Sequence, residues 1–448
     1  MNATRGNGAG LDLSPRRLRP VELGKHKALL GGIIRLANRH AIPDRERALG
    51  IPYRLLSEVA VLTPPVVTDI LASPQFGAWA NDALRCLLTG APAMNGVPRA
   101  IGLGRLALFA ATAAVRAGHP FDVTIPLTDG MASFPALGSA YVDAPSTGAA
   151  RPWEWGRAWL DDTGCHVQSP SATVDIPATL AGAAGNWSPL PRVTVTERGL
   201  CLDVVLDHND PFLDRYGTAR SPAGGPDGLR WRSLLAAGWR ILAGDHQALA
   251  SIVAGAIRTV VPLVEPDPQH MASGTEETAF GAIGLSLPPD ALAMAQVLVH
   301  ESHHAVLGAF RDIEPLVRAD DERDRERPFL GYAPWRDDPR PAHALLQGIY
   351  AHYGMGQFWR REYLEGAASH RERAAIEFGR MRTMTARGAS TLAGSGLLTD
   401  AGREFLAGIE DEVAQWQGEP LPATTQEHVA DLTRQHEVRW RARWLAQT

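Results

Sequence analysis

Three residues of one segment, His300, Glu301 and His304, have the types and the spacing of a metal site, H-E-x-x-H. Side chains four residues apart share one face of an α-helix, so both imidazoles can reach one ion while the carboxylate lies beside it. Apolar residues at 297–299 and 305–307 favour a buried helix. In a zinc hydrolase the glutamate accepts a proton from the water at the metal. The alternative is a core helix, or a former metal site, whose histidines are only hydrogen-bonded.

Two protein ligands are too few for a stable mononuclear site, so we expect a third from a neighbouring helix or loop. Downstream, a proline-rich loop runs into a helix that starts near residue 341. His343 on that helix is the first candidate, Asp338 near its amino end the second, and Glu314 the third. Asp338 is equally suited to cap the helix or to pair with a neighbouring arginine. His303, three residues after His300, is expected beside the site or facing solvent.

The elements around the motif predict an α+β fold that is predominantly helical. Helical spacing of apolar residues runs from about 22 to 88 and returns at 107–115, 229–242, 249–261 and after 341. Alternating patterns predict strands at 173–176, 192–197, 201–206 and 282–287, with a turn at Asp129-Gly130. Asp290 marks the start of a helix over 290–310. We expect a small sheet from 120–210 and 280–287 near the HExxH helix, an arrangement that resembles the zincins.

The chain is expected to form one integrated module rather than independent domains. Its regions are a flexible tail (1–20), an N-terminal helical region (21–118), a mixed strand and helix region (119–290), the helices of the HExxH site (291–360) and a C-terminal helical region (361–448).

Composition excludes several classes of function. The 44 Lys and Arg residues against 49 Asp and Glu give a net charge of -5, which argues against a nucleic-acid binder or a membrane-surface binder. Three widely spaced cysteines provide neither a disulfide framework nor a thiolate zinc cluster. The first residues lack the apolar segment of a secretory signal, and no run of about 18 apolar residues predicts a transmembrane helix. We expect a cytoplasmic protein.

The motif and its surroundings resemble a known family. The segments L-V-H-E-x-x-H, Y-A-P-W-R-D-D-P-R-P and L-L-Q-G-I-Y-A-H, in this order, are similar to the HExxH-motif proteins encoded with ribosomally synthesised, post-translationally modified peptides. Further landmarks in the expected order extend the resemblance over nearly the whole chain. One departure is Ser302-His303, where the family is expected to have an aromatic residue and a glutamine.

The resemblance implies an iron(II)- and 2-oxoglutarate-dependent oxygenase that hydroxylates a side chain of a precursor peptide, often at the β-carbon. Two histidines and one further ligand would leave three positions of the iron for 2-oxoglutarate and dioxygen. The distal carboxylate of 2-oxoglutarate then calls for an arginine, and Arg340 is slightly favoured over Arg336. The family pattern also falls on Trp335 and Asp338, and we expect Trp335 and Tyr350 to contact substrate.

Three hypotheses of different classes therefore stay open. The first is the peptide hydroxylase that uses iron(II) and 2-oxoglutarate. The second is a zinc metallopeptidase or other zinc hydrolase, with Glu301 as general base and Arg336, Arg340 or Tyr350 stabilising the oxyanion. The third is a non-catalytic module that recognises a peptide and carries a vestigial motif.

Overall fold

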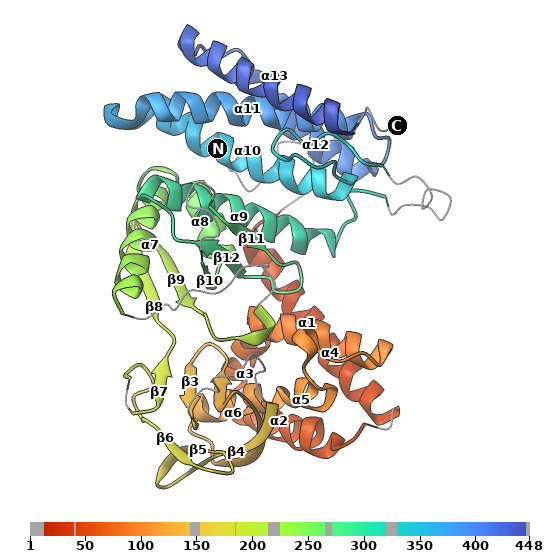
Figure 1. Ribbon diagram of the computed structural model, residues 1–448, viewed down its shortest axis with the longest axis vertical. Coiled ribbons are helices and arrows are strands. Elements are labelled where there is room, and N and C mark those ends of the chain that lie inside the picture. The colour runs from red at the N-terminus through yellow and green to blue at the C-terminus, as the bar shows by residue number, and fades with distance from the viewer. Residues whose placement is uncertain are drawn as a thin grey trace.

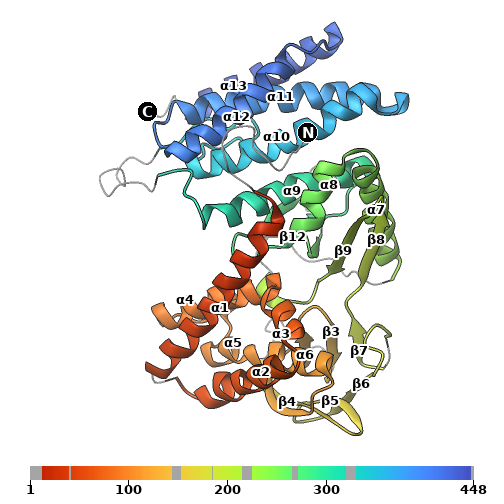
Figure 2. The same ribbon diagram turned by 180° about the vertical axis from the view of Figure 1, so that it is seen from behind.

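Helices and two β-sheets make up a mixed α+β structure that is 59% helical, as the sequence predicts. The computed structural model describes residues 13–39, 42–143, 153–183, 185–213, 225–264, 271–318 and 329–444. Figures 1 and 2 show two lobes, with the first half of the chain in one and the second half in the other.

The N-terminal lobe packs helices against a seven-stranded, barrel-like antiparallel sheet with the strand order β6-β5-β4-β1-β2-β3-β7. Its helices are α1 (Pro15–Arg39), α2 (Ile51–Leu62), α3 (Pro64–Leu71), α4 (Pro74–Thr89), α5 (Arg99–Gly104) and α6 (Leu106–Ala117), with a π-helical turn at Glu46–Gly50. Its strands are β1 (Phe121–Thr128), β2 (Met131–Phe134), β3 (Gly138–Tyr141), β4 (Trp153–Asp161), β5 (Gly164–Gln168), β6 (Thr173–Ile176) and β7 (Trp187–Pro189).

The C-terminal lobe is built on a five-stranded mixed sheet with the order β11-β12-β10-β9-β8, in which β9, β10 and β12 are parallel and both edge strands are antiparallel. The strands are β8 (Arg192–Glu197), β9 (Leu200–Leu206), β10 (Thr259–Leu263), β11 (Ser273–Thr275) and β12 (Ala282–Ser286). Helices α7 (Gly225–Asp245), α8 (Gln247–Ala256) and α9 (Ala291–Arg311) pack on this sheet and on one another.

Four long helices form the other layer of this lobe, on the far side of α9 from the sheet (Figure 1). α10 contacts α9 directly, and α11 packs on α10. These helices are α10 (Ala342–Glu365), α11 (Arg371–Ala393), α12 (Asp400–Gln417) and α13 (Ala423–Trp444).

Each lobe has its own hydrophobic core. One core joins the apolar side chains of α2 to α6 with those of the barrel-like sheet. The other joins the five-stranded sheet with α7 to α12. Helix α1 links the two cores, since Leu18 belongs to the C-terminal core and Leu30 and Ile33 to the N-terminal one.

Three expectations from the sequence are wrong in detail. Strands from 120–210 and 280–287 do not share one sheet, because those up to 189 form the barrel-like sheet and those from 192 onward form the sheet beside α9. The helix expected over 249–261 ends at Ala256, and Thr259–Leu263 is the buried strand β10, because a short apolar run does not distinguish a buried strand from a buried helix. The predicted tail contains the first turns of α1 from Pro15, anchored by buried Leu18, while residues 1–12 lie outside the described residues.

Local signals in the sequence set several element boundaries. Asp129 and Gly130 both adopt positive φ, 51° and 68°, and close the hairpin between β1 and β2, as their dipeptide predicts. Gly118 ends α6 in the left-handed conformation with φ 62°.

By length and composition, one stretch of the described residues, Arg99–Ala117, could cross a membrane. It covers α5 and α6, and 78% of its apolar window is buried inside the fold. Because a core helix passes the same test, this is weak evidence for a membrane span.

Candidate metal site

Helix α9 carries the H-E-x-x-H motif and is fixed at its start by an N-cap. The carboxylate of Asp290 accepts a hydrogen bond from the backbone N–H of Ala293 at 2.7 Å and pairs with Arg373 at 2.6 Å. These contacts satisfy one of the free N–H groups of the first turn. Because most of α9 is buried against α7, α8 and α10, its side chains have little freedom to move.

The two motif imidazoles point at each other. The Nε2 atoms of His300 and His304 are 3.1 Å apart, and the two rings are nearly perpendicular, at 89°. Two nitrogens bound about 2.0–2.1 Å from one ion at roughly 90–110° would lie about 2.8–3.4 Å apart. The pair therefore has the separation that shared coordination requires.

The second ring nitrogens differ in their partners. His304 donates from Nδ1 to the side-chain oxygen of Gln347 on α10 at 3.2 Å, which leaves its Nε2 lone pair available to a metal. His300 Nδ1 is buried without a hydrogen-bond partner. Only the His304 ring is thus held in one tautomer by a neighbouring side chain.

Glu301 is held by the edge strand of the five-stranded sheet. Its side chain is 1% exposed, and its Oε2 accepts a hydrogen bond from Thr275 Oγ1 of β11 at 2.5 Å. The other oxygen, Oε1, lies 3.8 Å from His300 Nε2. The carboxylate is therefore fixed beside the imidazole pair, as a general base or an orienting group would be.

A third imidazole, His352 of α10, lies close to this pair. Its ring centroid is 5.7 Å from that of His300, and its ring stacks on the indole of Trp335 with centroids 4.4 Å apart. His352 donates from Nδ1 to the backbone carbonyl of Gly348 at 2.8 Å, which leaves Nε2 as the free lone pair. A backbone carbonyl on the second nitrogen is the usual arrangement for a metal-binding histidine.

Burial keeps these rings neutral. Desolvation, followed by the neighbouring histidines, lowers the pKa of His300 well below its usual value. Desolvation also lowers the pKa of His352 to about 4, although the hydrogen bond to Gly348 opposes this shift. A neutral imidazole is the form that binds a metal, so both rings are ready to act as ligands at neutral pH.

These side chains line one cavity of about 390 Å³ between α9, α10, β11 and the loop before α10. Ser273, Gly274 and Thr275 of β11 form part of its wall. The other lining residues are Glu277, His300, Glu301, His304, Trp335, Arg336, Arg340, His343, Ala344, Gln347, Gly348 and His352.

The two arginines of the cavity share one carboxylate. Arg336 and Arg340 contact the two oxygens of Asp338 at 2.9 and 3.0 Å. All three side chains stay accessible, since 54%, 36% and 42% of their surfaces are exposed. The arginines, first of Arg340 and then of Arg336, outweigh the effect of burial and lower the pKa of Asp338.

The three residues that the sequence suggests as third ligands lie in different places. His343 is exposed and lines the cavity in the first turn of α10. Asp338 is held by the two arginines and is not part of the lining, and exposed Glu314 lies beyond the end of α9, also outside the lining.

Tyr350 and His303 lie behind the site. Tyr350 is buried outside the cavity lining and packs on Phe405 and on the ring of His303, 4.7 Å away. His303 is 1% exposed and donates to the carbonyl of Val299 at 2.8 Å, so it is a core residue rather than a solvent-facing one.

Sequence reasoning missed His352 and Thr275. His352 ends the segment L-L-Q-G-I-Y-A-H, four residues after the glycine whose carbonyl holds it, so a signal was present. Nothing in the local sequence relates Thr275 to Glu301, which lies 26 residues further along the chain. In the described part of the chain, no group of three His, Cys, Asp or Glu side chains has the arrangement of a complete metal site.

Comparisons with other proteins leave the site to be interpreted on its own geometry. No protein-family model matches the chain, and no curated protein matches it.

Proposed function

We propose that the chain is a metal-dependent peptide-modifying enzyme, an iron(II)- and 2-oxoglutarate-dependent oxygenase that hydroxylates a side chain of a ribosomal precursor peptide, at its β-carbon. One observation carries this proposal. Two neutral imidazoles whose Nε2 atoms are 3.1 Å apart line the same cavity as two exposed arginines. The cavity thus offers ligands for a cation and partners for a small dicarboxylate.

His300 and His304 would hold the ion, and His352 is the residue best suited to complete the set. Imidazoles that share one ion have ring centroids about 4.5–5.5 Å apart, from metal–nitrogen distances of about 2.0–2.1 Å. The observed separations from His300 are 4.6 Å for His304 and 5.7 Å for His352. A small rotation of His352 would therefore suffice, and it supports His352 above His343, Asp338 and Glu314.

Bound iron(II) would supply the oxidising chemistry, in which one atom of dioxygen enters the peptide and the other enters succinate. The residues of the chain bind and orient the reactants. Arg340 or Arg336 would take the distal carboxylate of 2-oxoglutarate in place of Asp338, whose exposed pairing with the two arginines is easily exchanged.

The edge strand β11 offers a place for an extended peptide. It is paired only with β12, and Ser273, Gly274 and Thr275 line the cavity. A peptide that added a strand along this edge would run past the histidine pair and the indole of Trp335. The mixed sheet, its antiparallel edge strand and the adjacent α9 are similar to a zincin arrangement.

That similarity, together with Glu301, favours a second candidate, a zinc metallopeptidase. Glu301 Oε1 lies 3.8 Å from His300 Nε2, and Thr275 holds the other oxygen. This carboxylate is placed to accept a proton from a water molecule held at the histidine pair, which is the role of the glutamate in zinc hydrolases.

Metal content and co-substrate turnover separate the two candidates. The protein is purified without oxygen, its metal is measured, and succinate release is followed with 2-oxoglutarate and a library of precursor peptides. Bound iron with peptide-dependent succinate and a mass gain of one oxygen supports the oxygenase. Bound zinc with peptide cleavage and no succinate rejects it in favour of the peptidase. Peptide binding without retained metal rejects both and leaves a non-catalytic peptide-binding module.

A further inference from the structure

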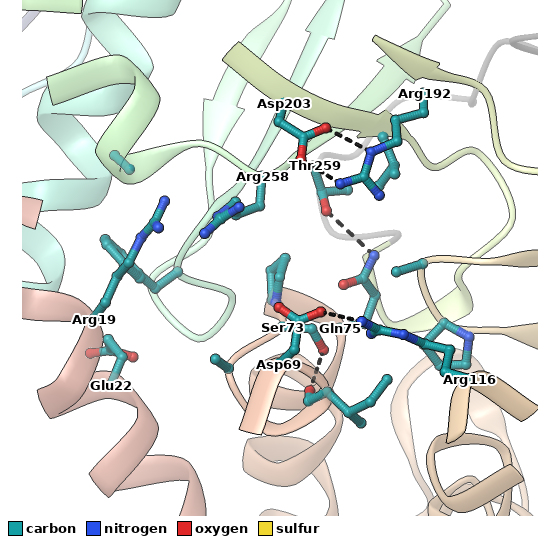
Figure 3. Close-up of a pocket in the computed structure, with 18 residues that line it drawn as sticks. Arg19, Glu22, Asp69, Ser73, Gln75, Arg116, Arg192, Asp203, Arg258 and Thr259 are labelled. Atoms are coloured by element: carbon teal, nitrogen blue, oxygen red, sulfur yellow. Dashed lines mark hydrogen bonds and ion pairs between the residues drawn. The ribbon is translucent and has the colours of Figure 1, made fainter. Parts of the chain in front are cut away.

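A second cavity, of about 120 Å³, lies where the two lobes meet (Figure 3). Its walls come from α1, α3 and the start of α4 on one side and from β8, β9 and the start of β10 on the other. It shares no lining residue with the histidine cavity. A group bound here would touch elements of both cores.

Four arginines surround this cavity, and two of them have acidic partners. Arg192 pairs with both carboxylate oxygens of Asp203, and Arg116 pairs with Asp69 at 2.8 Å. Figure 3 shows these pairs towards one side of the cavity, with Arg19 and Arg258 on the opposite side. The charges of Arg192 and Arg116 are therefore balanced within the protein.

Arg19 and Arg258 have no carboxylate partner of this kind among the described residues. Arg19 donates to the backbone carbonyl of Ala254 at 3.2 Å. The guanidinium of exposed Arg258 makes no hydrogen bond within the described part of the chain. Desolvation, followed by the charge of Arg258, lowers the pKa of Arg19 to about 10. The nearby Glu22 is already paired with Lys25 at 3.1 Å. Two positive charges thus face the cavity with nothing to offset their repulsion.

Gln75 supplies an independent indication of a ligand. It is fully buried in the cavity wall, and its Oε1 has no hydrogen-bond partner. The amide cannot be turned to remove this defect, because its Nε2 donates to the buried carboxylate of Asp207 at 2.9 Å. Figure 3 shows the free oxygen turned towards the cavity. Leaving a buried acceptor unpaired is costly, so this oxygen calls for a donor on whatever fills the space.

We infer that this cavity binds a phosphate group, either inorganic phosphate or a small phosphate monoester. The oxygens of such a group accept hydrogen bonds from Arg19 and Arg258, and its O–H donates to Gln75 Oε1. A carboxylate without a further donor meets only the first requirement. The positive end of α4, whose Ser73 and Pro74 line the cavity, adds to the attraction. The site is independent of the metal centre and of the chemistry proposed there.

Sulfate is the probe that isolates the role of Gln75. It has the shape and the charge of monohydrogen phosphate but carries no proton at neutral pH. Titration calorimetry of the full chain with phosphate and with sulfate, at constant ionic strength, should show phosphate binding tighter by about tenfold or more. A small phosphate monoester that binds more tightly than inorganic phosphate would identify the natural form of the ligand. Equal affinities for phosphate and sulfate, or no binding of phosphate, would overturn the inference.

Arginine variants locate the binding. Arg258→Ala removes an exposed side chain without hydrogen bonds, so the fold should be kept, and phosphate affinity should fall about tenfold or more. Arg240→Ala on the exposed face of α7 is the matched control, and its affinity should be unchanged. Arg340→Ala should also leave phosphate affinity unchanged, because Arg340 lines only the histidine cavity. Unchanged affinity in Arg258→Ala, or a loss in Arg340→Ala alone, would place the anion elsewhere and refute the assignment.

Discussion

Replacing His352 tests the metal site most directly, because this residue distinguishes what the structure suggests from what the sequence suggests. His352→Gln removes the third imidazole but keeps a polar side chain in the space between Trp335 and His300. We expect it to lose metal affinity, whereas His343→Ala should bind metal as the unchanged protein does. His343 and His352 are nine residues apart on α10, which is about 13 Å along the helix axis, so the two are alternatives for one ion.

The structure allows the size of the effect to be worked out. Loss of a group that only orients a metal ligand already costs about 10–100-fold in affinity, so loss of an imidazole ligand should cost about 100-fold or more. That factor corresponds to about 2.7 kcal/mol. In the metal-free protein, the change also removes the hydrogen bond to Gly348, about 1 kcal/mol, and the stacking on Trp335, about 0.5–1.5 kcal/mol.

The assay is a competition between the protein and a chromophoric chelator for zinc or cobalt(II), with iron(II) measured without oxygen. Thermal unfolding of each metal-free variant shows whether the fold survives. If His352→Gln binds as tightly as the unchanged protein and His343→Ala does not, the geometric argument for His352 is wrong and His343 completes the site. Equal losses in both variants would indicate that the two helices move together on metal binding.

Four further predictions test the rest of the structure. Glu301→Gln should change how succinate release is coupled to peptide hydroxylation; loss of peptide cleavage, with no 2-oxoglutarate use by the unchanged protein, would instead support the peptidase. Arg340→Ala should raise the 2-oxoglutarate requirement about 10–1000-fold with metal binding intact, whereas an unchanged requirement and a lower melting temperature would leave only a structural role. Asp290→Ala removes the N-cap of α9 and should lower the free energy of unfolding by about 1 kcal/mol in denaturant titrations, while Asp290→Asn should recover most of it. Burial lowers the pKa of His26, so the unfolded chain takes up a proton near about pH 6.5 before the folded chain does, and stability should fall as the pH drops below that value. Denaturant titrations across this range should give a flatter profile for His26→Gln, and an equally steep profile would show that His26 is not the group responsible.

Local signals predicted those parts of the fold in which one segment determines its own structure. Asp129-Gly130 needs two positive φ angles, and Asp290 before an apolar helix needs only its own first turn. The boundary near residue 257 could not be predicted in this way. The strand β10 is wholly buried between β9 and β12, and its side chains therefore show no alternation. The division of the strands into two sheets depends on pairings far apart in the sequence, such as that of β9 with β10.

The candidate site divides along the same line. The pattern at His300 and His304 fixes their spacing on one helix, and the 3.1 Å between their Nε2 atoms follows from that spacing. Which residue of α10 approaches them depends instead on how α10 docks on α9. Gln347 meets His304, so the turn that follows it, with His352, lies next to His300. No property of the sequence near residue 343 or 352 states that register.

The contact between Glu301 and β11 links the metal site to the place proposed for the peptide. The hydroxyl of Thr275 donates to Oε2 of Glu301, and the same strand edge lines the cavity. A peptide that pairs with β11 would therefore press on the residue that fixes this carboxylate, which in turn lies beside His300. Under either proposed chemistry, peptide binding and the orientation of Glu301 should be coupled. Thr275→Val, which keeps the shape of the strand and removes only the donor, should weaken this coupling: turnover with bound peptide should fall while metal affinity and peptide affinity hold. If Thr275→Val turns over peptide at the unchanged rate, the hydrogen bond at 2.5 Å is structural and the strand does not act on the site through Glu301.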